Sequence, residues 1–300
     1  HAEEEARRPI AVASGIEPVG EREFGVDYWG RVLAAPSSST ERAYLRELAE
    51  QLALHEAALL RAVMPSELQG LAFAKPATKH ERAPNVQLLI THFNRMSRWV
   101  CTQVVKQATP RDRARCLRLF IDFARLCHEL GNYNAVMEIV AALNSAALYR
   151  LKRTWDALKP SSKHAFDELG DLVKPERSHA ALRHAMRVAA RKGAAVPYLG
   201  LYLSDLTFIE DGNADYVASE DVAGERLVNL GKIAMLGKAI GEVLQFQQLE
   251  YQLEHAPKLA IYFTSLDPPD DDEIYALSLA CEPREGDAAA GGGAHGGAVN

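Results

Sequence analysis

Few side chains in this sequence stand in a pattern that could carry out covalent chemistry. Glu210 and Asp211 are adjacent carboxylates at the end of an apolar stretch. Adjacent positions of a helix point about 100° apart, so the pair cannot easily flank one scissile bond as the two acids of a glycosidase do. His179 and His184 are five residues apart, which misses the i, i+4 spacing of a helical metal-binding pair. These spacings predict neither a general acid–base pair nor a metal site.

The sequence also lacks the motifs that bind phosphate or activate a nucleophile. No GxxxxGK[ST] or GxSxG pattern occurs, and the glycine run 291–293 lies in a low-complexity tail. The four cysteines, Cys101, Cys116, Cys127 and Cys281, lie within apolar helical patterns and have no CxxC or Cys/His ligand spacing. We interpret them as reduced core residues of a cytoplasmic protein. We expect no cofactor, no metal ion and no conventional enzyme.

Length and charge limit the remaining classes. The chain has 300 residues, of which 48% are hydrophobic, enough for a sizeable core. Its 34 basic and 40 acidic residues give a net charge of −6 without a long basic run, so nucleic acid is not an expected partner. No apolar run approaches the roughly 18 residues that span a bilayer, and the amino-terminal residues do not resemble a signal peptide. A soluble globular protein is the favoured class.

The two acidic residues must be positioned by the stretch 196–213. Pro197 suits the first turn of a helix, and Gly212 and Asn213 supply a stop signal. A second helical pattern runs from about 221 to 253, so the two segments predict a helical hairpin. Taken alone, its tip is most simply a solvated acidic turn. The residues that anchor the first arm recur at helical spacing: Leu199, Tyr202, Leu203, Leu206 and Ile209.

Helical patterns also fill the rest of the chain between residues 40 and 284, without an alternating strand run. The expected fold class is all-α, a single large helical domain with a protruding helical hairpin. We expect this domain at 39–284, a mostly irregular lead-in at 1–38 and a Gly/Ala-rich disordered tail at 285–300. The expected helices begin after Ser39 or Thr40, at Asn85, at Thr109 and Pro110, at Asn134, near Tyr149 and on either side of Pro175.

Several separated segments occur in an order that is typical of one family. They lie at 60–68 (LRAVMPSEL), 93–100 (FNRMSRWV), 130–134 (LGNYN) with Glu138 and Ile139, 142–145 (ALNS), 149–155 (YRLKRTW), 196–213, and 274–279 (IYALSL) leading to 282–284. In this ordered set the sequence resembles the RasGEF catalytic domain, the all-helical module that promotes guanine-nucleotide exchange on Ras-family small GTPases. The resemblance covers roughly residues 40 to 284.

The resemblance implies roles for residues of the hairpin. Thr207 and Asp211 match two positions that act on the nucleotide site of the GTPase, the first near the bound Mg²⁺ and the second at the Ser of the phosphate loop. Other members have a larger apolar residue and Glu at these positions, which shortens the reach of Asp211. Thr207 and Asp211 are i and i+4 and share one helix face. Glu210 is expected among the GTPase contacts.

The resemblance also implies a gripping surface outside the hairpin. Met137, Asn144 and Tyr149 match positions that hold the second switch of the GTPase, and Gln87 and Thr91 match the neighbouring helix face. Asn144 is expected to be required for exchange, because a bidentate amide near a helix end can bind backbone groups of a partner. At Thr91 some members carry an Arg that pairs with an acidic switch residue, so that ion pair is not expected here.

The function implied is a guanine-nucleotide exchange factor that acts on a Ras, Rap or Ral type GTPase. Since such GTPases are lipid-anchored, we expect it to be recruited to a membrane without inserting. An exchange-inactive GTPase-binding scaffold of the same fold is the alternative. Two observations motivate it: the Thr at position 91, and the roughly 39 residues before the first expected helix, which are too few for the upstream domain that braces the hairpin in many members.

Overall fold

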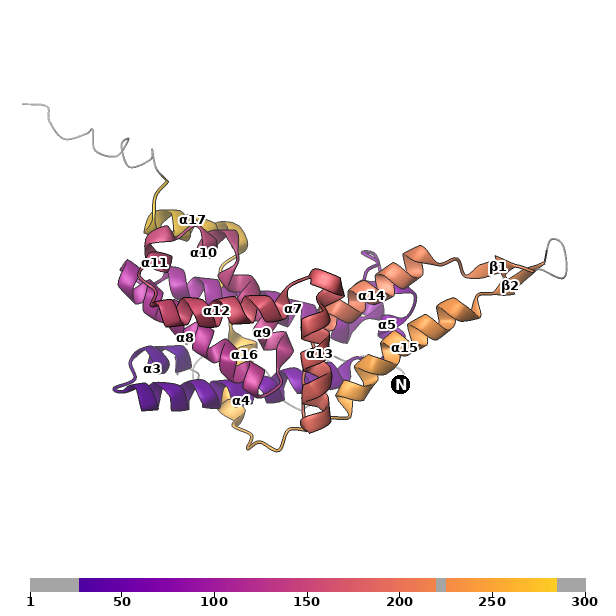
Figure 1. The fold of residues 1–300 in the computed structure, drawn as a ribbon, viewed down its shortest axis with the longest axis horizontal. Coiled ribbons are helices and arrows are strands. Elements are labelled where there is room, and N and C mark those ends of the chain that lie inside the picture. The colour runs from indigo at the N-terminus through magenta and orange to yellow at the C-terminus, as the bar shows by residue number, and fades with distance from the viewer. Residues whose placement is uncertain (1–26, 220–224, 285–300) are drawn as a thin grey trace, which may run out of the picture.

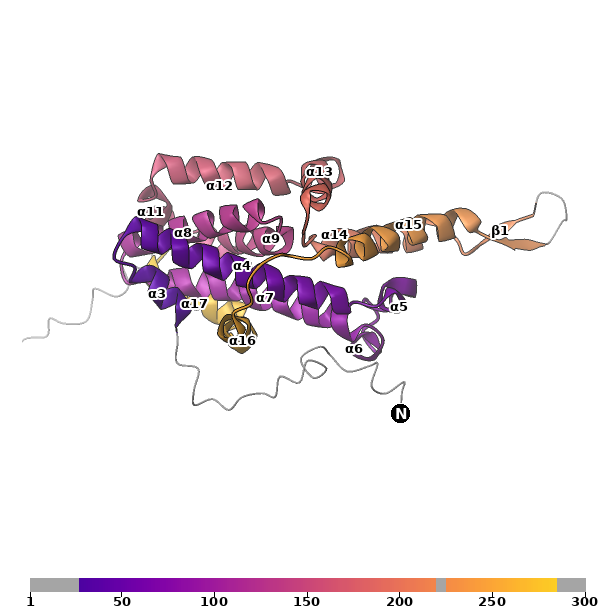
Figure 2. The same cartoon turned by 90° about the horizontal axis from the view of Figure 1, so that it is seen from below.

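The structure, a computed structural model, describes residues 27–219 and 225–284. These residues form a lobe of packed helices from which one long hairpin projects (Figure 1). Seen from below, the hairpin extends well past the lobe in the same direction (Figure 2). The lobe comprises α3 (Tyr28–Leu33), α4 (Ser38–Ala62), α7 (Pro84–Val105), α8 (Pro110–Glu129), α9 (Tyr133–Leu143), α10 (Ala146–Tyr149), α11 (Lys152–Asp156), α12 (Pro160–Val173), α16 (Pro257–Ser265) and α17 (Asp271–Cys281).

Local sequence signals account for the long helices of the lobe. Thr109 caps α8 by accepting a hydrogen bond from the backbone N–H of Asp112 at 3.1 Å, and Pro110 occupies its first turn, as expected. Gly131 follows the end of α8 with φ +74°, and an added Cβ there would lie 3.0 Å from the carbonyl oxygen of Ala194. Glycine is therefore required by both conformation and space. Asn132, rather than the expected Asn134, then caps α9.

An aromatic cluster lies at the centre of the lobe. The ring of Trp29 stacks on Phe120 at 4.0 Å between centroids and meets Trp99 edge-on at 5.3 Å. Trp29 belongs to α3, which is capped by Asp27. The expected irregular lead-in therefore does not hold for the end of that segment, because burial of a large aromatic side chain stabilises a helix there. Residues 1–26 of the lead-in, and the expected tail at 285–300, lie outside the described residues.

The hairpin consists of α14 (Leu199–Gly212) and α15 (Leu230–Gln247). Between them lie β1 (Tyr216–Ala218) and β2 (Arg226–Val228), which pair antiparallel with Val217 opposite Leu227. The second arm was expected as a helix over about 221–253; a helix is present, but it extends only over 230–247, so the expected bounds were wrong. Residues 226–228 pair as a strand, and Asn229 caps the helix that follows. The all-helical expectation holds for the lobe and for both hairpin arms.

The base of the hairpin is packed into a second hydrophobic cluster. Leu206 and Val243, one from each arm, are fully buried. The amide Nε2 of Gln247 donates to the carbonyl oxygens of Leu60 at 2.8 Å and Val63 at 2.7 Å, which ties the end of α15 to the end of α4. Further packing comes from α5 (Pro65–Leu68), the 3₁₀ turn η1 (Gln69–Leu71), α6 (Lys79–Arg82) with α7, and α13 (Glu176–Lys192).

The cysteines are reduced in the part of the chain that the structure describes. All four cysteines are free thiols, with Cys101, Cys116 and Cys127 buried and Cys281 half-buried. Burial raises the pKa of the Cys101 thiol to about 11 and that of Cys116 to about 12. Among the helices of residues 27–219 and 225–284, none combines the length and the apolar character that a bilayer crossing requires.

Replacing Leu206 with Ala tests the packing of the hairpin base. Leu206 is 0% exposed, so Leu206→Ala should lower the free energy of unfolding by about 2–4 kcal/mol through lost burial and a residual cavity. Phe208, two residues away and 75% exposed, is the matched control, and Phe208→Ala should change the same quantity by less than about 0.5 kcal/mol. Denaturant unfolding of both variants measures this; equal effects would contradict the assigned faces of α14.

Candidate functional site

One face of α14 passes from the core into solvent within two turns. Leu203 is buried, Thr207 is half-buried and Asp211 is exposed, each four residues after the last. The hydroxyl of Thr207 donates to the carbonyl oxygen of Leu203 at 2.9 Å. Its hydrogen is therefore used within the helix, and the methyl group and the oxygen lone pairs remain for outside contacts. The structure brings Thr207 and Asp211 onto one face, as their spacing predicts.

The adjacent carboxylates of Glu210 and Asp211 have different surroundings. Glu210 is half-buried, and its Oε2 lies 2.5 Å from the Nζ of Lys232 on α15. The same ammonium lies 2.6 Å from Oδ1 of Asp215. Asp211, within the described part of the chain, has neither a hydrogen bond nor an ion pair to its side chain and is exposed. The carboxylate of Asp211 is therefore available to a partner, whereas that of Glu210 ties α14 to α15.

Mutual hydrogen bonding stabilises the charged forms in this ion pair. The hydrogen bonds from Lys232 to Asp215 and then to Glu210 raise the pKa of the lysine above its ordinary value of 10.5. The same lysine lowers the pKa of Asp215 below 3.8. The stabilisation of the fold that Lys232 contributes is complete below pH 10.5 and is lost as pH rises through the raised pKa of the lysine. The stabilisation that Asp215 contributes is lost as pH falls through the lowered pKa of its carboxyl group. The connection is thus intact at neutral pH.

A second group of predicted residues lies where α9 ends and α10 follows. Asn144 is exposed at the C-cap of α9; its backbone N–H donates to the carbonyl oxygen of Val140. Tyr149 ends α10 with 63% of its side chain exposed, and the Nζ of Lys152 lies 4.2 Å from its ring centroid. Met137 is half-buried on α9. Asn144 and Tyr149 therefore present an amide and an aromatic ring to solvent from two packed helices.

The two predicted residues of α7 face in different directions. Thr91 is exposed, and its hydroxyl donates to the carbonyl oxygen of Gln87 at 2.8 Å. Gln87 itself is buried, and its Nε2 donates to the carbonyl oxygen of Phe73 at 2.9 Å. The structure thus does not bring Gln87 to the surface with the others. Its side chain holds the segment before α7 against the helix.

Several residues that support this surface were missed at the sequence level. Glu67 is buried and accepts hydrogen bonds from the backbone N–H groups of Asn85 and Val86 at 2.8 and 3.0 Å, which fixes the start of α7. Arg150 donates to the carbonyl oxygens of Ser278 and Glu282, which holds α17 against α10 beside Tyr149. Only Glu67 had a local sequence signal, because it lies two residues after Pro65, a residue that can begin a helix. The other contacts join residues more than a hundred positions apart.

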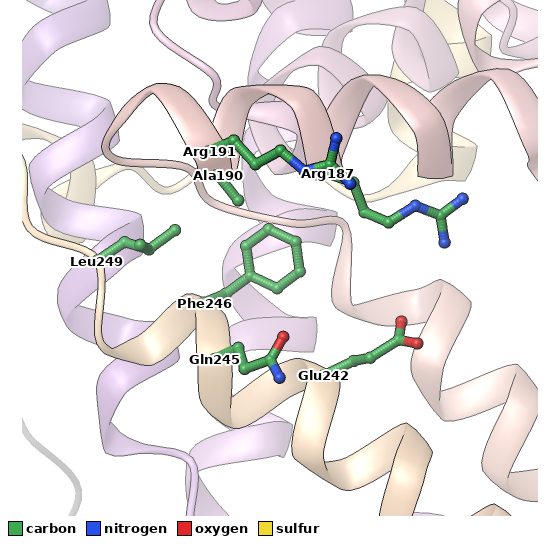
Figure 3. A pocket seen from close by; sticks show the side chains of 7 residues that line it. All are labelled: Arg187, Ala190, Arg191, Glu242, Gln245, Phe246 and Leu249. Carbon is green, nitrogen blue, oxygen red and sulfur yellow. The ribbon is translucent and has the colours of Figure 1, made fainter.

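A groove at the base of the hairpin lacks the groups that covalent chemistry needs. A groove of about 370 Å³ lies between α13 and α15 at the hairpin base. Figure 3 shows the ring of Phe246 at its centre, with Arg191 of α13 extending above the ring and Arg187 extending past it on the side of Glu242 from α15. No nucleophile with a neighbouring base lines it. The exposed face of α14 and the α9–α10 surface are the stronger candidates for function.

Comparison with known proteins shows the family of the chain. The RasGEF domain model matches residues 47–234, more than half of the chain. The chain belongs to the RasGEF domain family. It is 38% identical over 241 residues to Ras-specific guanine nucleotide-releasing factor 2 of Mus musculus, covering 79% of this chain and 19% of that protein. It is 36% identical over 240 residues to Ras guanine nucleotide exchange factor P of Dictyostelium discoideum, covering 80% and 15%.

A human relative shows a similar identity and a similar coverage. Ras-specific guanine nucleotide-releasing factor 1 of Homo sapiens is 35% identical over 241 residues, which cover 79% of this chain and 18% of that protein. The chain therefore spans about a fifth or less of the length of the curated relatives it matches. Within the RasGEF domain, the hairpin that carries Thr207 and Asp211 is the element that projects from the lobe (Figure 1).

The role of Lys232 can be tested by removing its charge. Lys232→Ala leaves the half-buried carboxylate of Glu210 without its cation, so amide hydrogen exchange at residues 209–215 should become faster while the lobe is unchanged. Lys238→Ala, which alters an exposed lysine on the same helix, is the control and should leave exchange at 209–215 as it is. Unchanged protection in Lys232→Ala would show that the ion pair does not hold the tip of α14.

Proposed function

We propose that this RasGEF domain promotes the release of GDP from a Ras-family small GTPase by inserting its α14–α15 hairpin at the nucleotide site. The observation that carries the proposal is the carboxylate of Asp211, which is exposed and unpaired within the described chain at the end of a helix whose base is buried. Membership in the RasGEF family and the names of the relatives, which are releasing and exchange factors for guanine nucleotides, support it.

In the proposed mechanism Asp211 competes with the nucleotide for the phosphate loop. Small GTPases bind their nucleotide through backbone N–H groups, a Lys, a Ser and Mg²⁺. A carboxylate placed among those donors forms charge-assisted hydrogen bonds in place of a phosphate. Thr207, one turn nearer the lobe, would occupy the region of the Mg²⁺ and disfavour its octahedral coordination. The nucleotide would then leave faster without any covalent step.

The α9–α10 surface would grip the GTPase while the hairpin acts. Asn144 offers an amide with both donors and an acceptor, which suits backbone groups of a switch segment. Tyr149 adds an exposed aromatic ring, and Met137 and Thr91 complete the surface. Gln87 and Glu210 would act indirectly, Gln87 by holding Phe73 against α7 and Glu210 by pairing with Lys232.

The direction of exchange would come from nucleotide concentrations. By linkage, a protein that weakens nucleotide binding is itself bound more weakly, by the same factor, once nucleotide returns. Abundant free GTP would therefore displace this domain and leave the GTPase loaded. The GTPase is of Ras, Rap or Ral type in this proposal, and the domain meets it in the cytoplasm at the surface of the membrane that anchors it.

Substitution of Asn144 tests the proposed binding of the GTPase by the α9–α10 surface. Asn144→Ala should abolish detectable acceleration of fluorescent GDP release from a panel of Ras, Rap and Ral type GTPases, because the exposed amide is lost without opening a core cavity. Its melting temperature should stay within about 2 °C of the parent. Full exchange activity in Asn144→Ala would remove this residue from the site. If the parent binds a nucleotide-free GTPase but accelerates release from none of the panel, the scaffold alternative holds.

Substitution of the two neighbouring carboxylates tests the hairpin. Asp211→Asn should slow GDP release about tenfold or more, because a charge-assisted hydrogen bond is worth about 1.5–3 kcal/mol. Asp211→Glu, which keeps the charge and lengthens the side chain, should retain or increase the rate. Glu210→Gln is the matched control, since its effect should appear in hydrogen exchange at the tip of α14 and only weakly in the rate. A larger rate loss in Glu210→Gln than in Asp211→Asn would overturn the assignment.

A further inference from the structure

Three helices of the lobe, α4, α7 and α9, meet at a group of ionisable side chains in the core. Glu56, His92 and Glu138 contribute one residue from each helix and are 0%, 4% and 0% exposed. The Nε2 of His92 lies 3.1 Å from Oε1 of Glu56 and 3.8 Å from Oε1 of Glu138. One nitrogen or oxygen atom from each residue lies within 4.8 Å of the other two. The group is buried beneath the surface that presents Met137, and the proposed exchange mechanism assigns these three side chains no contact with the GTPase.

Acceptor atoms outnumber donors in this group. Oε2 of Glu56, Oε2 of Glu138 and Oδ1 of the neighbouring Asn134 are buried and have no hydrogen-bond partner among the described residues. Asn134 does donate through Nδ2 to Oε1 of Glu138 at 3.0 Å. An unpartnered carboxylate oxygen in an apolar interior is costly. The shortage is one of positive charge, which a cation or bound protons would supply.

The ionisable groups that face the cluster do not supply that charge. The ring of His55 lies 5.0 Å from that of His92 between centroids, and among the described residues no hydrogen bond or ion pair joins it to either carboxylate. Burial, and then the charges of Glu56 and Glu138, raise the pKa of the Cys127 thiol on α8. Arg95 on α7 donates to the carbonyl oxygen of Thr264, and the phenol of Tyr251 donates to that of Leu130. Among the described residues, His92 is the ionisable partner of both carboxylates, and Asn134 donates to Glu138.

The geometry suits a small divalent ion. In a tetrahedral site with metal–ligand bonds of about 2.0–2.1 Å, the ligand atoms lie about 3.3 Å apart. The distances of 3.1 and 3.8 Å from the Nε2 of His92 lie on either side of that value. Two carboxylates with a neutral imidazole balance a charge of +2, and this ligand set suits zinc and similar ions. Helix bundles hold metal ions in their cores with the same residue types.

We propose that Glu56, His92 and Glu138 are three ligands of a buried structural site for a divalent transition-metal ion of zinc type, which joins α4, α7 and α9, with the unpartnered Oδ1 of Asn134 or a water molecule as the fourth ligand. Such a site would stiffen the helix that carries Met137 and ends at Asn144. Ser97 of α7 already donates to the backbone carbonyl of Glu138 at 2.9 Å, so the ion would add to an existing connection. The expectation of no metal site rested on local spacings, whereas Glu56 and His92 are 36 residues apart.

The rival occupant is a shared proton. Burial, and then the charge of Glu56, raise the pKa of Glu138 well above its ordinary value, so a neutral Glu138 could donate to Glu56. The two occupants respond differently to Glu138→Gln. A glutamine keeps the shape and a donor, so it would replace a protonated carboxyl with little loss, but it removes a charged ligand from a metal site.

The test measures metal content directly. The whole chain is produced in zinc-supplemented cells, dialysed against metal-free buffer and analysed by elemental mass spectrometry, with about one zinc ion per chain expected. Protein unfolded with chelator and refolded with cobalt(II) should show the visible absorption of a tetrahedral cobalt centre, and its melting temperature should exceed that of protein refolded without metal.

Glu138→Gln should lose most of the zinc, and Glu47→Gln, an exposed change on α4, should retain it. Zinc below about a tenth of an equivalent in the parent, with no cobalt spectrum after refolding, would overturn the proposal in favour of the shared proton.

Discussion

A hairpin that acts on another protein must be rigid although most of its distal surface lies in solvent, and burial of its base meets this constraint. Leu206 and Val243 are fully buried between the arms and the lobe, and Gln247 bonds to the last carbonyl groups of α4. Farther out, where apolar packing ends and side chains such as Phe208 and Leu230 are exposed, Lys232 joins the two arms through ion pairs. Because the hairpin is ordered before it meets a partner, less binding energy is lost in ordering it.

Elements with strong local signals could be predicted from the sequence. Thr109 and Pro110 begin α8 as expected, and Pro175 separates α12 from α13. The apolar period of α14 and the stop at Gly212 placed Thr207 and Asp211 on one face of a hairpin arm. These features depend on neighbours within a turn or two, such as a cap, a proline or a helical repeat of apolar residues, so they can be read without the rest of the fold.

Features that depend on distant contacts could not be predicted in this way. Gln87 follows the period of α7, but its amide turns inward because the carbonyl oxygen of Phe73 lies within reach. Trp29 lies in a charged, irregular-looking segment, and packing against distant rings such as those of Trp99 and Phe120 makes it a core residue. Glu56, His92 and Glu138 are unremarkable acidic and histidine residues in sequence, and they meet only because three helices pack together. In each case the partner lies too far along the chain for a local pattern to indicate it.

The two carboxylates at the end of α14 show how one geometric rule can exclude a function and support another. Adjacent helical residues diverge by about 100°, which argues against Glu210 and Asp211 as the paired acids of a hydrolase. The same divergence lets Glu210 turn toward Lys232 while Asp211 stays exposed. If both carboxylates faced outward, α14 would lose its ion pair with Lys232 and the tip would carry two like charges side by side. The arrangement instead joins one anchored carboxylate, which pairs with α15, to one exposed carboxylate, to which the proposed function assigns the place of a phosphate at a partner's donors.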